Sequence, residues 1–484
     1  MLGPPKTRDL NRPVLISMES YVPKDHFYRH LHRVLDLSFV RDLVADRYAD
    51  GGRPSIDPIV FFKLELMMFF AGIRSERQLL EQASYNLAMR WYAGYNLDEP
   101  LPDRSSLSKI RARLGLAVFR RFFKTVTEQC VTAGLVWGDE LIFDATKVRA
   151  NASMGSLIPR LHLLTEEHLA QLEPPECAAT LWAKNDARWD LLEECRLDPD
   201  RPASEGYERK SNRLVSTTDP DAVAMKTRGE RAALGYHNHY IIDGGKARII
   251  LNALVTPADV IENTPMLPLL RRAMFRWRVK PKQVVADTTY GTANNIRELE
   301  ESGIRAYVPL PDWDQRTPYY GPSLFVYDPE ADLYHCPQGA PMRRYTAVHT
   351  GRQMVRYRAE AAICNACPVK AACTASNHGR QIARSLDADY LDRVRGYHET
   401  EAYRKAMRKR KVWIEPLFGE AKQWHGMRQF RLRGLQKVNM EGLFIAAGQN
   451  LKRLLSARGW GRRPWPDGAA GCVGLTSRIC SSPM

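Results

Sequence analysis

The chain lacks any long uninterrupted apolar run, and this absence excludes a membrane-spanning helix. The closest candidate, 59–73, is interrupted by Lys63 and Glu65, whereas a membrane helix needs roughly 18 to 20 apolar residues. The first residues also lack a basic segment followed by an apolar run and a small-residue cleavage site, so we expect no export. We therefore expect a cytoplasmic protein with no membrane partner.

Acidic residues are scarce relative to basic ones, which points to an anionic partner. The 484 residues include 71 Lys and Arg against 55 Asp and Glu, a net charge of +16 at pH 7. From 401 to 463 there are 16 basic and 4 acidic residues, a surplus of 12. This balance is the electrostatic footprint of a polyanion-binding protein, and it favours nucleic acid as the partner.

Nothing in the composition indicates disorder or a fibrous protein, because 44% hydrophobic and 26% charged residues are ordinary for globular chains. The length predicts two to four folded units. Up to about residue 134 the pattern predicts helices. Asp57 and Pro58 are an N-cap and a first helical residue for a helix through 71, and Ser75 begins a second helix.

A short basic helix is predicted over 107–113, capped by residues 103–106 and ending at Gly115. It follows other helices, and a helix, a turn and a basic helix are typical of proteins that read DNA. Lys109, Arg111 and Arg113 are therefore candidate DNA contacts. The alternative is an ordinary solvated helix face.

A β segment begins at 141–146, a short apolar run that contains Asp144. The runs 239–243 and 247–255 flank a Gly-Gly turn and should form an antiparallel pair. Another strand, 283–287, ends in Asp287. Helices are expected at 263–277 and 292–302, and a strand at 306–309. Between 155 and 234 the sequence predicts helical pieces at 166–172 and 179–192.

Three carboxylates make the sharpest chemical constellation: Asp144 and Asp287 at the ends of separate strands, and Glu415 on a late helix. Magnesium prefers oxygen ligands and keeps several waters, so such acids suit two Mg²⁺ or Mn²⁺ ions. Two ions can activate a water or a 3′-hydroxyl and stabilise the leaving oxygen of a phosphodiester. The alternative is a set of turn-capping or solvated carboxylates.

The sequence around each acid resembles the catalytic blocks of bacterial insertion-sequence DDE transposases. The matching stretches are DATKVRANAS at 144–153, ADTTYG at 286–291 and IEPLFGEAK at 414–422. In the third block, the family signature combines a Tyr, an Arg, the Glu and a Lys on one helix face. Lys422 takes the Lys position, whereas Lys411 replaces the Arg and Arg408 replaces the Tyr. The resemblance implies that Lys422 contacts a DNA phosphate, with Lys411 and Arg408 as further candidates.

The resemblance covers nearly the whole chain and implies a mixed α/β fold with an RNase H-like catalytic core. GRPS at 52–55 and PDRSSL at 102–107 resemble the family's N-terminal helical domain, which contacts transposon ends. We therefore expect the chain to begin with an N-terminal helical DNA-binding domain, 1–135, followed by the first part of the core, 136–311, with a helical insert at 155–234. A cysteine-rich insert, 312–399, then precedes the C-terminal helices of the core, 400–456. The last residues, 457–484, are expected to form a disordered tail.

Nine cysteines are ordinary for this length, and four of them cluster at 336–373. Cys364 and Cys367 are separated by two residues, and Cys336 and Cys373 flank them. Four thiolates suit a structural zinc ion that would hold together a segment with few apolar runs. An iron–sulfur cluster and unmetallated thiols are the alternatives that the spacing leaves open.

The function implied by the resemblance is metal-dependent cutting and joining of double-stranded DNA at the terminal inverted repeats of a mobile element. It further implies a bacterial, nucleoid-associated protein that acts on DNA as a homodimer or higher assembly, because two ends must be paired. Two alternatives remain at this stage. One is a metal-dependent nuclease without joining activity, and the other is an inactive DNA-binding regulator derived from a transposase.

Overall fold

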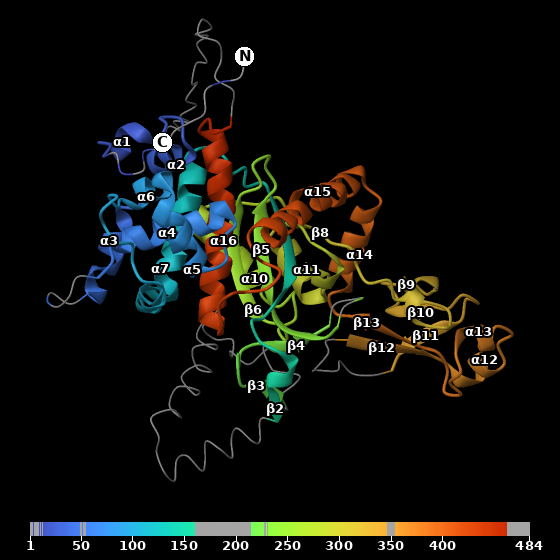
Figure 1. Ribbon diagram of the computed structural model, residues 1–484. Helices are drawn as coiled ribbons and strands as arrows, with labels where there is room; N and C mark the ends of the chain where they lie inside the picture. Colours follow the sequence, from blue (N-terminus) through green and yellow to red (C-terminus); the bar gives the residue numbers. More distant parts are fainter. Residues whose placement is uncertain are drawn as a thin grey trace, which may run out of the picture.

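The structure is a computed structural model that describes residues 13–48, 55–159, 214–226, 231–345 and 354–461, with positions 3, 9, 11, 51 and 229. The N-terminal part is helical, as predicted (Figure 1). Its helices are α1 (Met18–Tyr21), α2 (Phe27–Val34), α3 (Phe39–Val44), α4 (Pro58–Ala71), α5 (Glu76–Tyr85), α6 (Leu87–Ala93) and α7 (Arg104–Thr132), with the 3-10 turn η1 (Ala45–Arg47) after α3.

Capping residues set the helix starts where the sequence predicted them. The Asp57 carboxylate accepts a hydrogen bond from the Ile59 backbone N–H, and Pro58 occupies the first turn of α4. The Ser75 hydroxyl accepts from the Gln78 N–H at the start of α5. The basic helix breaks at Gly115, with φ 66° and ψ 175°, but it resumes at once and α7 continues to Thr132. The predicted end of the helix is therefore a kink.

A mixed six-stranded sheet forms the centre of the molecule. Its strands are β1 (Glu140–Arg149), β4 (Val223–Met225), β5 (Ala233–Asp243), β6 (Ile250–Pro257), β7 (Gln283–Val285) and β8 (Arg305–Tyr307). Strands run in the order β4-β5-β1-β7-β8, and β6 pairs with β5. The β5–β6 hairpin is antiparallel, as predicted from the Gly-Gly turn. By contrast, β7 is parallel to both β1 and β8.

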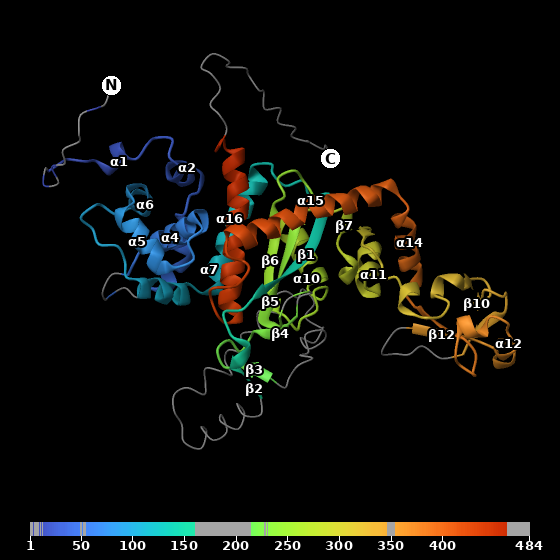
Figure 2. The same cartoon turned by 45° about the vertical axis from the view of Figure 1, so that its right-hand side comes forward.

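Five described helices from the second half of the chain pack around the sheet. They are α10 (Met266–Trp277), α11 (Ala293–Glu301), α14 (Ala388–His398), α15 (Glu401–Trp424) and α16 (Leu435–Ala457), with the 3-10 turn η3 (Thr288–Tyr290) after β7. Helix α16 lies between the N-terminal helices and the sheet, packing on α7 and on β6 (Figures 1 and 2).

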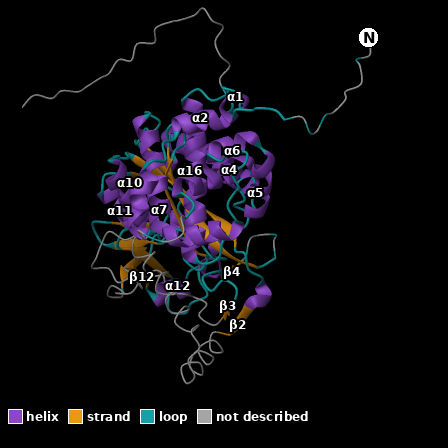
Figure 3. Ribbon diagram, turned by 60° about the vertical axis from the view of Figure 1, so that its left-hand side comes forward, coloured by secondary structure: helices purple, strands orange, loops and turns teal. Residues whose placement is uncertain are grey.

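One continuous hydrophobic core joins the N-terminal helices to the sheet and to α16. Phe62 and Phe122 stack on each other, and Phe122 also stacks on Phe444 of α16. Figure 3 shows the resulting layer of helices beside the strands. The N-terminal helices therefore share their buried surface with the C-terminal helix of the chain, a contact that sequence patterns do not reveal.

The segment predicted as a cysteine-rich insert is a second, smaller body with its own core (Figure 2). It contains an antiparallel sheet in the order β13-β12-β11-β10-β9. Its elements are the turns η4 (Asp314–Arg316) and η5 (Pro322–Leu324), the strands β9 (Val326–Asp328), β10 (Leu333–His335), β11 (Pro341–Arg344), β12 (Met354–Ala359) and β13 (Gln381–Ser385), and the helices α12 (Ala361–Asn365) and α13 (Lys370–Cys373). Sequence patterns do not predict this sheet, because its strands are only three to six residues long.

The predicted helical insert at 155–234 is only partly described. Its described residues form the turn η2 (Met154–Ser156) and short strands, with β2 (Leu157–Pro159) paired to β3 (Leu214–Ser216), and β4 joining the central sheet. The described residues of this segment are mostly extended rather than helical, because β2 pairs with β3 and β4 pairs with β5. The helical pieces predicted at 166–172 and 179–192, and nearly all of the predicted tail, lie outside the described residues.

Candidate active site

The sheet register brings Asp144 and Asp287 together. In the parallel pair of β1 and β7, Ile142 lies opposite Val285. Asp144 and Asp287 each come two residues later, and side chains two apart point to the same face of a sheet. Asp144 is not at a strand end, as the sequence predicted, because β1 continues to Arg149, and Asp287 lies two residues after β7 ends at Val285. The strand pairing nevertheless brings the two carboxylates to the same face.

Each aspartate uses one oxygen locally and presents the other to a shared cation. Asp144 Oδ1 accepts from the Ala145 N–H at 2.9 Å, and Asp287 Oδ1 accepts from the Thr289 N–H at 2.9 Å. The two Oδ2 atoms both face Arg410 of α15, whose Nη2 lies 2.9 Å from that of Asp144 and 3.7 Å from that of Asp287. The free oxygens of the two acids therefore converge on one positive group.

Burial and neighbouring acids perturb this site. Burial raises the pKa of Asp144 to about 6, with Arg410 opposing the shift and the charges of Asp287 and Glu262 adding to it. Burial also raises the pKa of Glu262, which lies in the loop after β6, and the charge of Asp287 raises it further. A concentration of partly buried carboxylates of this kind is typical of functional sites and calls for a cation.

Sequence reasoning missed Arg410 and Glu262. Arg410 shares the buried face of α15 with Ile414 and Leu417, four and seven residues later, and this spacing was the available signal. Glu262 lies in a loop without periodicity, so its approach to Asp287 could not be read from local sequence. Its carboxylate is 3.6 Å from His237 Nε2.

The third predicted acid, Glu415, is exposed on α15. Among the described ion pairs and hydrogen bonds, it is Arg410 and not Glu415 that joins this helix to Asp144 and Asp287. Glu415 follows Arg410 by five residues, which is about 140° around a helix at 3.6 residues per turn. When Arg410 faces the aspartates, Glu415 therefore faces elsewhere. Within the part of the chain that the structure describes, no three His, Cys, Asp or Glu side chains form a group that could hold a metal.

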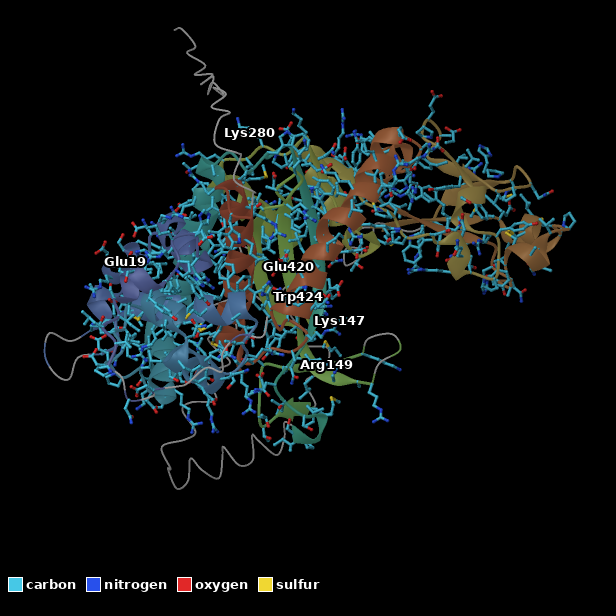
Figure 4. All side chains as sticks on the ribbon, turned by 45° about the horizontal axis from the view of Figure 1, so that its top comes forward. Glu19, Lys147, Arg149, Lys280, Glu420 and Trp424 are labelled. Atoms are coloured by element: carbon cyan, nitrogen blue, oxygen red, sulfur yellow. The ribbon has the colours of Figure 1, made fainter. Side chains whose placement is uncertain are left out.

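The other candidate phosphate contacts on α15 have separate surroundings. Lys411 is exposed and Lys422 is half-buried on the same helix face as Glu415. Arg408 is exposed and forms an ion pair with Glu401 at 2.6 Å. The neighbouring Glu420 joins α15 to α16. Its carboxylate accepts a hydrogen bond from Gln449 and forms ion pairs with Lys452 and Arg453. Figure 4 labels Glu420 near the C-terminal end of α15.

Arg111 is buried in an ion cluster, which corrects its assignment as a groove contact. Only 4% of the residue is exposed. Its guanidinium pairs with Glu65 of α4 and, at 2.5 Å, with Glu76 of α5. Arg431, between α15 and α16, pairs with the same two glutamates. Because Arg111 lies on the core-facing side of α7, it holds the N-terminal helices to the C-terminal segment.

Lys109 and Arg113 remain on the solvent side of α7. Arg113 lies with its guanidinium 5.0 Å from the Tyr48 ring centroid and its Nη1 3.4 Å from Ser55 Oγ. Two of the three basic residues predicted on this helix are therefore accessible to an external partner.

The four clustered cysteines belong to the small insert. Cys336 follows β10, Cys364 lies in α12, Cys367 follows α12, and Cys373 ends α13; all four are free thiols. Burial raises the pKa of Cys373, and the charges of the other three cysteines contribute in the same direction. Cys373 is thus within electrostatic reach of the other three thiols, although no group of side chains in the described part of the chain is arranged to hold a metal.

Comparison with protein families matches two segments of the chain, and neither of them contains Asp144 or Asp287. Residues 16–113 match a family described as Transposase domain (DUF772), and residues 335–455 match the Transposase DDE domain. The first match contains Lys109, Arg111 and Arg113, and the second contains Glu415 and the four cysteines. A search of curated proteins gave no match.

The two matched segments are similar to transposase domains, and the DDE domain supports a DNA transposase activity. DNA is accordingly its partner. The DDE domain implies an RNase H-like core, with which the mixed central sheet agrees. No helix in the described ranges is both long and apolar enough to cross a membrane.

Proposed function

We propose that the protein binds the terminal inverted repeats of an insertion sequence and catalyses divalent-metal-dependent strand cleavage and strand transfer. The observation that carries the proposal is the convergence of Asp144 and Asp287 on Arg410, two residues beyond the last paired residues of β1 and β7. Catalysis by positioned carboxylates needs no covalent protein intermediate, so no Ser or Tyr nucleophile is invoked.

The two aspartates fit a divalent cation, because both are hard oxygen donors and their Oδ2 atoms already share one positive group. Asp144 and Asp287 would hold Mg²⁺ or Mn²⁺. Glu415, which the sequence resemblance implies as the third ligand, faces elsewhere in this structure and would have to turn toward them to take that role. Bound ions supply activation of a water or a 3′-hydroxyl and stabilisation of the leaving oxygen. The raised pKa of Asp144 is consistent with a site that gains from added positive charge.

The chain's own residues orient the DNA. We propose that Lys422, Lys411 and Arg408 contact phosphates beside the aspartates, since all three lie on the same helix as Arg410, α15. Lys109 and Arg113 would contact the backbone of the transposon end from α7. We further propose that two copies act together, since cutting and joining two ends requires both in one assembly.

The cysteines are proposed to bind a structural zinc ion, because Cys336, Cys364 and Cys373 pack in one small core and the charge of Cys367 also acts on Cys373. Metal analysis of freshly purified protein tests this. About one zinc per chain is expected; iron would instead indicate a cluster, and neither metal would remove the site from the account. Cys130, which is buried in α7, is the control: its replacement by Ala should leave the metal content unchanged.

Strand transfer of a labelled duplex carrying the element's end sequence tests the function. The wild type should nick the repeat boundary with Mg²⁺ or Mn²⁺ and join the product to a second DNA. Asp144→Asn should abolish both steps, whereas Asp389→Asn, at an 88% exposed side chain in α14, should not. Nicking without joining would identify a nuclease, and binding without nicking would identify a regulator.

The third acid is tested by comparing Glu415→Gln with Glu262→Gln in the same assay. We expect the first to abolish nicking and the second to leave it detectable. The reverse result would transfer the role to Glu262, which is the acid that the described structure places beside Asp287.

A further inference from the structure

A row of arginines covers the solvent face of the insert's sheet. Along β12, Val355, Tyr357 and Ala359 are buried, whereas Arg356 is exposed and Arg358 half-buried. This alternation is that of a strand with one face on a core. Arg343 of β11 is exposed on the same side, next to the buried Met342.

The strand register places these charges side by side. Arg343 lies directly opposite Arg358 in the antiparallel pair of β11 and β12, and Arg356 is two residues further along β12. Like charges directly across a pair of strands destabilise it. The arrangement therefore costs the insert stability unless an external anion neutralises it.

Other arginines of the same sheet have their own carboxylates. Arg344 faces Asp332 at 3.8 Å, and Arg384 pairs with Asp389 at 2.8 Å. Among the ion pairs of the described residues, none includes Arg343, Arg356 or Arg358. Carboxylates thus neutralise Arg344 and Arg384, whereas no carboxylate in the described part of the chain neutralises this row.

The row ends in a polar, aromatic corner. The Arg358 guanidinium lies 3.6 Å from the centroid of the Tyr345 ring, and the Tyr345 hydroxyl donates to Gln381 Oε1 at 2.9 Å. Stacking fixes the plane of Arg358 and leaves the guanidinium less entropy to lose when it binds a ligand.

Protection of a sheet edge does not explain the charges. Edge strands often carry charged residues to prevent pairing with other chains. Strands β11 and β12, however, are interior strands of the order β13-β12-β11-β10-β9. The five strands also contain arginine and no lysine, and the planar guanidinium suits bidentate contacts with phosphate better than an ammonium does.

We propose that Arg343, Arg356 and Arg358 form a second DNA contact surface, which binds the phosphodiester backbone without reading its sequence. The identity of the ligand rests on the proposed function, which makes DNA the polyanion at hand. The surface lies on the projecting insert, outside the aspartate site and the basic face of α7 (Figures 1 and 2). The full-length protein therefore holds DNA at the insert as well as at the core.

The test is the salt dependence of DNA binding by the full chain, measured by fluorescence anisotropy with a random-sequence duplex and with the end duplex. The triple variant Arg343→Gln, Arg356→Gln, Arg358→Gln should bind both duplexes roughly tenfold or more weakly at low salt. Its slope of log affinity against log salt should fall by about 2 to 3, since each lost phosphate contact removes about 0.9.

The matched control removes the same charge from the exposed segment between α10 and β7, as Arg278→Gln, Lys280→Gln, Lys282→Gln. It should keep the wild-type slope. Equal losses in both triple variants would indicate a general charge effect and overturn the proposal, as would an unchanged slope in the insert variant. A loss confined to the end duplex would also overturn it, because backbone contacts do not distinguish sequences.

Folding is checked by thermal melting, and the insert variant should melt at or above the wild-type temperature because it loses a like-charge row. If it does not fold, the three single variants replace it, each with an expected slope change of about 0.9. Metal-dependent nicking by the wild type, measured in parallel, tests the proposed function on its own and separates the two failures.

Discussion

Arg410 Nη2 lies 2.9 Å from Asp144 Oδ2, so a cation from α15 neutralises the acid in the middle of β1, the first strand of the core. The same nitrogen is 3.7 Å from Asp287 Oδ2. The Arg410 side chain is only 12% exposed, which strengthens these contacts relative to a surface pair. One helix residue therefore couples the position of α15 to both aspartates.

Arg410→Gln should make the protein less stable without metal but more responsive to it. The two carboxylates lose their internal counter-charge, so Mn²⁺ should raise the melting temperature of the variant more than that of the wild type. Differential scanning fluorimetry with and without Mn²⁺ measures this, and Arg408→Gln, at an exposed position of the same helix, is the control. An equal Mn²⁺ effect in wild type and Arg410→Gln would show that Arg410 does not compete for the same oxygens.

Arg111→Gln should cost stability rather than DNA affinity. Removing one partner of a buried ion cluster leaves Glu65 and Glu76 partly uncompensated, and about 3 to 5 kcal/mol of unfolding free energy is expected to be lost. Chemical denaturation measures this. The double variant Lys109→Gln, Arg113→Gln should do the opposite, weakening DNA binding with little change in stability. Loss of affinity without loss of stability in Arg111→Gln would restore it as a DNA contact.

Glu420 predicts a pH dependence of stability. Its carboxylate pairs with Lys452 and Arg453. Despite burial, the hydrogen bond with His425 and these cations hold its pKa well below the ordinary 4.5. Because the folded pKa is the lower one, the stabilisation is present above pH 4.5 and is lost as the pH falls toward the folded value. Glu420→Gln should therefore cost about 2 to 4 kcal/mol at pH 7.

The matching measurement is urea denaturation of wild type and Glu420→Gln from pH 7 down to the lowest pH at which both fold. The difference between them should narrow as the pH falls below 4.5. A difference that stays constant over this range would mean that the charge of Glu420 is not what joins α15 to α16.

Gly448 tests whether the N-terminal helices and the core form one body. A Cβ at this position of α16 would lie 2.5 Å from the Phe69 ring of α4, so Gly448→Ala should cost about 1 to 3 kcal/mol through overpacking. Gly419→Ala in α15, where nothing lies within 4 Å of the added atom, should stabilise by about 0.5 to 1 kcal/mol. Thermal melts distinguish the two, and equal effects would contradict the close packing of α16 on α4.

Local signals in the sequence are enough to predict several helices and strands of the fold. The caps at Asp57 and Ser75 and the hairpin turn between 239 and 255 depend on neighbours in sequence. The strand ending at Asp287 was recognisable for the same reason. These elements are confirmed because short-range sterics and hydrogen bonding decide them.

Long-range pairing decided what the sequence could not predict. Arg111 looked like one of three basic residues on a helix, and only the approach of Glu65 and Arg431 shows that it is buried. Arg410 and Glu262 reach the aspartates from distant segments. The arginine row of the insert depends on the register between β11 and β12. None of these relationships has a local pattern.

The most direct test of the account is a double-mutant cycle on Asp144 and Asp287. Single-turnover nicking of the end duplex is measured for Asp144→Asn, Asp287→Asn and the double variant, with the wild type for reference. If the two acids act as a unit, the double variant should be no slower than the slower single variant, because either loss already disables the site. Rates that multiply instead, or single variants that nick as fast as the wild type, would contradict the claim that these two residues form one catalytic centre.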